Sequence, residues 1–99
     1  MKLSITQWDE ICDNFREMFQ GLGIVKTTDV LLSFSSIEPY VSTGISLARD
    51  GAMAANMPLH NLDSRFDTVT FDELFEKITL SGHGFTYTYK IPEELLSIR

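Results

Sequence analysis

The sequence predicts an α+β domain in which an N-terminal amphipathic helix packs on an antiparallel sheet of about four to six strands. Three observations lead to this class. Apolar residues follow a helical period up to Gln20, a period of two dominates from residue 24 onward, and glycine-containing turns separate the alternating segments. The 99 residues, 43% of them apolar, suit one globular domain spanning 1–99.

The predicted helix runs from about Ser4 to Gln20. Ser4 or Thr6 can cap its start, because each has a side chain able to complete a capping box three residues later. Gly21 can take the left-handed conformation that ends a helix. One face carries the apolar residues Ile5, Trp8, Ile11, Cys12, Phe15, Met18 and Phe19.

Alternating segments predict the strands. Leu32 and Phe34 belong to one such segment, which begins at Val30. A hairpin follows, with Asp50-Gly51 in its turn and residues 52–57 as its return arm. After the polar loop "HNLDSR", the residues around Phe71 predict a strand leading into one or two helical turns.

The stretch "KITLSGHGFTYTYKI" predicts the last hairpin, since apolar residues alternate on both sides of the glycines. Its second arm carries Phe85, Tyr87 and Tyr89. Pro92 can begin a short C-terminal helix, because proline is favoured in the first helical turn.

The charge excludes one class of function. The chain has 14 acidic and 8 basic residues, for a formal charge of −6, and the basic residues are scattered. A nucleic-acid binder draws its affinity from clustered Lys and Arg, so no nucleic acid is expected as a partner. No apolar stretch is long enough to cross a membrane, and the single cysteine and lack of Asn-x-Ser/Thr acceptors favour the cytoplasm.

The histidines are weak candidates for chemistry. His83 stands between two glycines, where a turn explains it better than a catalytic role. His60 and Asp63 could meet it only if the "MPLHNLD" loop approached that turn. Because the chain lacks metal-ligand spacings such as C-x-x-C or H-E-x-x-H, no metal and no cofactor are expected.

Two other features favour structural roles. Cys12 lies on the apolar stripe among acidic neighbours, which would raise its pKa and leave it unreactive. "GLGIVK" follows a helix instead of preceding one, so it is a helix end and not a phosphate loop.

Asp9, Asp13 and Glu17 form an acidic ridge along the helix although like charges four residues apart repel. Tyr87 and Tyr89 would supply an interface if their sheet face were uncovered. These residues predict a non-enzymatic protein-interaction module, either an inhibitor or a self-associating subunit, with a protein partner or a homo-oligomer. The alternative is a small-molecule-binding or enzymatic domain with a pocket near His60, Asp63 and His83.

Overall fold

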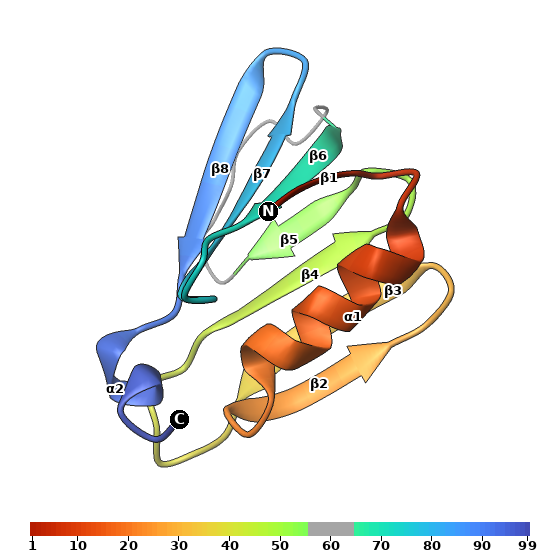
Figure 1. Ribbon diagram of the computed structural model, residues 1–99. Helices are drawn as coiled ribbons and strands as arrows, with labels where there is room; N and C mark the ends of the chain where they lie inside the picture. Colours follow the sequence, from red (N-terminus) through yellow and green to blue (C-terminus); the bar gives the residue numbers. More distant parts are fainter. Residues whose placement is uncertain (56–64) are drawn as a thin grey trace.

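The computed structural model describes residues 1–55 and 65–99, and the predicted α+β class is confirmed (Figure 1). The described chain has a longer helix near its start, strands, and a short helix near its end. In chain order the elements are β1 (Lys2–Ser4), α1 (Trp8–Phe19), β2 (Gly23–Thr27), β3 (Leu31–Ser36), β4 (Gly44–Ala48), β5 (Met53–Ala55), β6 (Phe66–Phe71), β7 (Lys77–Gly82), β8 (Phe85–Lys90) and α2 (Glu93–Leu96).

The described strands form two four-stranded antiparallel sheets. One sheet has the order β2-β3-β4-β5 and the other β1-β6-β7-β8. The division into two sheets was not expected from the sequence. The second sheet also includes β1, a three-residue strand too short to show alternation, which pairs with β6 through Leu3 and Val69.

The helix is shorter than the predicted Ser4 to Gln20. It begins at Trp8, because the residues before it are occupied in β1 and in a turn. The side chain of Gln7 accepts a hydrogen bond from the Ser4 backbone N–H at 2.9 Å, so the capping-box contact exists but lies ahead of the helix. At the other end, Gly21 has φ of 79°, as predicted, and Leu22 folds back into the core.

The segment between β6 and β7 is a turn and not the predicted helical turns. The Asp72 carboxylate accepts hydrogen bonds from the backbone N–H groups of Glu76 and Lys77, at 2.7 and 3.1 Å. An aspartate bonded to nearby backbone amides competes with the helix for the same donors, which explains the turn.

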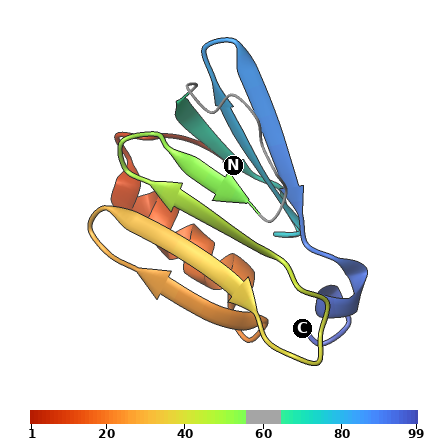
Figure 2. The same ribbon diagram turned by 180° about the vertical axis from the view of Figure 1, so that it is seen from behind.

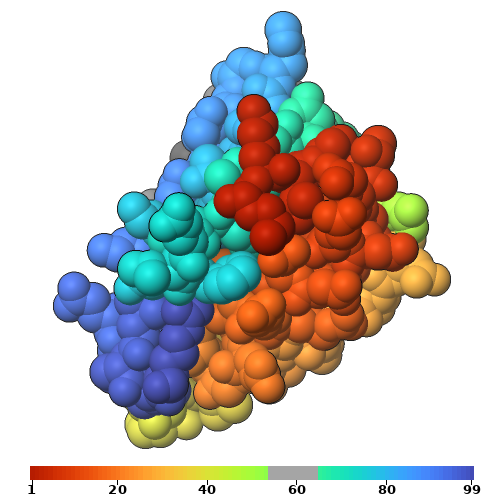
Figure 3. Space-filling view, viewed as in Figure 1, coloured from red at the N-terminus to blue at the C-terminus, as the bar shows by residue number. Residues whose placement is uncertain are grey.

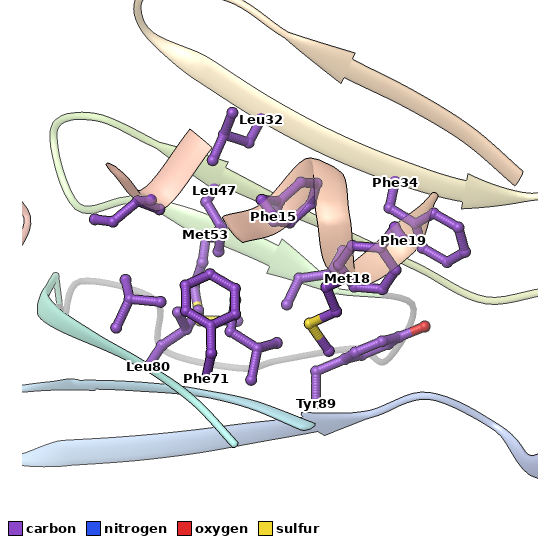
Figure 4. Packing of buried hydrophobic residues seen from close by; sticks show 14 of the residues in the cluster. Phe15, Met18, Phe19, Leu32, Phe34, Leu47, Met53, Phe71, Leu80 and Tyr89 are labelled. Carbon is purple, nitrogen blue, oxygen red and sulfur yellow. The ribbon is translucent and has the colours of Figure 1, made fainter. Parts of the chain in front are cut away.

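The buried core lies between the two sheets, with α1 wedged along one side (Figure 4). Phe19 shows the arrangement most directly, since its ring stacks on Phe34 of β3 at 4.2 Å and meets Tyr89 of β8 at 6.0 Å. Burying a side chain of this size contributes roughly 1.5–3 kcal/mol. The helix therefore holds the two sheets together through shared apolar contacts.

Neither α1 nor α2 covers the outer face of the β2-β3-β4-β5 sheet, as Figure 2 shows from behind. Within the described ranges, neither α1 nor α2 is long and apolar enough to cross a membrane.

Candidate functional site

The predicted histidine site is only partly described. His83 is exposed at the tip of the β7–β8 hairpin, in a two-residue turn whose second residue, Gly84, has φ of 85°. His60 and Asp63 lie outside the described residues. Among residues 1–55 and 65–99, no group of three or more His, Cys, Asp or Glu could hold a metal ion.

The two tyrosines point inward. Tyr89 is 6% exposed, and its hydroxyl lies 2.7 Å from the hydroxyl of Thr43. Tyr87 is half-buried against the core. The β8 side chains that face outward are Thr86, Thr88 and Lys90, so the outer face of the β1-β6-β7-β8 sheet does not carry the predicted aromatic pair.

The carboxylates of the acidic ridge, unlike the two tyrosines, lie at the surface. Asp9, Asp13 and Glu17 are all exposed, and each lines one of two hollows between α1 and the strand β2. We call these two hollows together the helix–strand groove. They are lined by Trp8, Asp9, Cys12, Asp13, Arg16, Thr27, Thr28 and Asp29 in one case and by Arg16, Glu17, Gln20, Gly21, Gly23 and Val25 in the other.

Arg16 is the wall that the two hollows share. Its guanidinium crosses the groove to donate a hydrogen bond to the Thr27 hydroxyl at 3.2 Å, and it also pairs with Asp13. The smaller hollow, about 250 Å³, lies on the Trp8 side of Arg16, and the larger, about 560 Å³, lies on the Gln20 side. Carboxylates therefore flank the arginine on both sides.

The other wall of the groove is a free sheet edge. Thr28 donates a backbone hydrogen bond to Leu31 at 2.8 Å, and Lys26 pairs with Ser33. Because hydrogen-bonded pairs alternate along an antiparallel ladder, the backbone groups of Gly23, Val25 and Thr27 point away from β3. They make no backbone hydrogen bond within the part of the chain that the structure describes.

The smaller hollow is closed at its base by two residues that each occur once in the chain. The Trp8 side chain is 2% exposed and donates from Nε1 to the Thr28 carbonyl at 3.4 Å. Cys12 is 9% exposed, and burial raises the pKa of its thiol. Arg16 lowers that pKa, and Asp9 and Asp13 raise it, to smaller extents than burial does.

The strand half of the groove was missed from the sequence. "GIVKT" is short, and Gly21 to Lys26 carried the signal of a helix end, which is correct but does not reveal that a strand follows directly. The β-branched residues Ile24, Val25 and Thr27, which are favoured in strands, are the signal that could have indicated it.

No family model matches this sequence, and no curated protein or solved structure is similar enough to it to indicate a relative.

Proposed function

We propose that this protein is a non-enzymatic interaction module that binds a basic protein partner at the acidic face of α1. One observation carries the proposal. The three carboxylates Asp9, Asp13 and Glu17 line a groove whose opposite wall is a sheet edge. A concave surface of net negative charge attracts a partner of the opposite sign and speeds their association.

The placement of the ridge supports binding over solubility alone. Carboxylates that serve only solubility can stand anywhere on the surface, whereas these three stand four residues apart in the helix that forms the groove wall. Repulsion between neighbours at this spacing costs a few tenths of a kcal/mol. We also propose the cytoplasm as the site of action, because Cys12 is the only cysteine and the chain needs no disulfide.

The test is affinity capture from an extract of the cells that make this protein, at low and high salt. The wild type is compared with the groove variant Asp9→Asn, Asp13→Asn, Glu17→Gln. The matched control is Glu38→Gln, Glu73→Gln, Glu93→Gln, which removes the same charge from exposed positions elsewhere. Proteins identified by mass spectrometry should be lost from the groove variant and kept by the control.

The groove variant should keep its fold, because neutralising a like-charged ridge removes repulsion. Its thermal unfolding therefore serves as an internal check. Equal capture by the wild type and the groove variant at every salt concentration would refute the proposed function.

A further inference from the structure

We infer that the partner contributes an extended basic segment that adds to β2 as a fifth strand of its sheet, with lysine or arginine at every second position. This inference rests on the proposed function and specifies how the groove is used. It follows from the free edge, from the spacing of the carboxylates and from the composition of this chain.

The free edge supplies the first step. An unpaired strand edge offers a row of N–H and C=O groups, and an extended peptide can satisfy them by strand addition. The groups of Gly23, Val25 and Thr27 are such a row, spaced two residues apart. The edge is bounded at one end by the turn at Gly21 and at the other by the Trp8 contact to Thr28.

The second step is the match between two periods. Residues four apart in a helix are separated by about 6 Å along its axis. Side chains on the same face of a strand recur every two residues, about 6.6 Å. Asp9 and Asp13 lie near the Thr27 end of β2, and Glu17 lies near the Gly23 end, so the helix and strand run side by side in opposite directions (Figure 1). A strand added to β2 would present alternate side chains to these three carboxylates.

The third step distinguishes this edge from the one at β8. The outward side chains of β8 include Lys90, which lies opposite Lys77 across the β7–β8 ladder. A basic segment would meet positive charge there. At β2, the side toward α1 offers four carboxylates, Asp9, Asp13, Glu17 and, from the neighbouring loop, Asp29, against one cation, Arg16. Lys26 of β2 is exposed on the opposite side of the strand.

The fourth step concerns a second copy of this chain as the occupant. The eight Lys and Arg residues are widely spaced, and the closest two, Lys90 and Arg99, are nine positions apart. This chain therefore has no segment with basic residues at alternate positions. The occupant belongs to a different protein.

Arg16 modulates the site. It neutralises part of the ridge by pairing with Asp13 and stands across the groove. A basic segment must compete with it, so we expect Arg16→Gln to strengthen binding severalfold by exposing the Asp13 carboxylate.

The experiment uses a synthetic peptide in which lysine alternates with threonine. The comparison peptide has the same sequence and charge but carries N-methyl groups on the alternate backbone nitrogens that would face β2. Binding to the wild-type protein is followed by the fluorescence of Trp8, the only tryptophan, which forms the base of the smaller hollow. Strand addition predicts that N-methylation weakens binding by about tenfold or more, since it removes several hydrogen bonds.

A protein variant tests the same contact from the other side. Val25→Pro removes an outward N–H that makes no ladder bond, and proline is tolerated at such edge positions. Val25→Ala truncates the side chain but keeps the N–H. The proline variant should lose several times more affinity for the alternating peptide than the alanine variant does.

Equal affinity for the two peptides would overturn strand addition, and so would failure of the alternating peptide to bind. Neither result would affect the proposed function if capture of the partner still depended on the three carboxylates. The peptide comparison needs no variant, so it decides the question even if Val25→Pro does not fold.

Discussion

The hydroxyl groups of Tyr89 and Thr43 lie 2.7 Å apart, and this hydrogen bond joins the two sheets. Tyr89 belongs to β8 in one sheet, and Thr43 directly precedes β4 in the other. The Tyr89 ring also meets Phe19 of α1. One side chain therefore connects all three parts of the core.

We expect Tyr89→Phe to lower the free energy of unfolding by about 1 kcal/mol, since it removes this hydrogen bond and keeps the ring. Tyr40→Phe is the matched control, because Tyr40 is 37% exposed. Urea unfolding of both variants checks the difference. A loss of the same size in the two variants would show that the Thr43 contact contributes nothing.

Stability should also fall at alkaline pH. Burial raises the pKa of Tyr87 and of Tyr89. As pH rises, the two phenols ionise at a lower pH in the unfolded chain than in the folded protein. Their contribution to the free energy of unfolding is therefore complete below about pH 10, and it is lost as pH passes through their raised pKa values in the folded state. Urea unfolding at a series of alkaline pH values measures the decline. The stability of the double variant Tyr87→Phe, Tyr89→Phe should decline less steeply with pH than that of the wild type. An equally steep decline would show that these two phenols do not cause it.

The stability that the β7–β8 turn contributes should depend on Gly84 and not on His83. Gly84 has φ of 85°, and a Cβ built there would meet no atom within 4 Å, so Gly84→Ala introduces backbone strain alone. That strain costs about 1–2 kcal/mol. His83→Ala should leave the melting temperature unchanged, because the side chain is exposed. If His83→Ala lowered the melting temperature more than Gly84→Ala did, the histidine side chain would have a structural role that the turn does not require.

The sequence predicted those parts of the fold that depend on local patterns. The apolar stripe of α1, the Asp50-Gly51 turn and the last hairpin all rest on neighbours within a few residues. The place of β1 depends on its pairing with β6, which joins Leu3 to Val69 near opposite ends of the chain. No local pattern records such a pairing.

The same distinction explains the site. The acidic ridge is visible in the sequence because a helix fixes which residues share a face. The groove is not visible, because it requires that the free edge of β2 lie beside that face. For a related reason, the sequence predicts an interface at Tyr87 and Tyr89 only on the condition that their sheet face is open. Alternation shows that two residues share a side of a strand, but it does not show which side is covered.

Arg99 should stabilise the end of α1. Its guanidinium donates hydrogen bonds to the carbonyls of Met18 and Phe75, at 2.7 and 2.5 Å, and to that of Leu74 at 2.9 Å. A cation near the carbonyl end of a helix is favourable. Figure 3 shows the C-terminal segment in blue against the orange end of the helix and the cyan turn after β6.

We expect Arg99→Ala to lower the free energy of unfolding by about 1–2 kcal/mol. This is less than buried hydrogen bonds to a charged group contribute, because Arg99 is exposed overall. Arg65→Ala provides the comparison. Arg65 makes an exposed ion pair with Asp50 at 3.4 Å, which is worth well under about 1 kcal/mol. Chemical denaturation distinguishes the two, and equal losses would mean that the contact of Arg99 with the helix end is not stabilising.

Cys12 should react slowly in the folded protein. Its side chain is 9% exposed, and burial raises the pKa of the thiol, so less of the reactive thiolate is present at a given pH. We expect dithiodipyridine to modify Cys12 at about pH 8 at least tenfold more slowly in the native protein than in urea, because both access and ionisation are reduced. Since Cys12 is the only cysteine, the absorbance of the released thiopyridone reports on this site alone. Equal reaction rates in the native protein and in urea would show that the thiol is open to solvent. The smaller hollow would then have to be far larger than about 250 Å³.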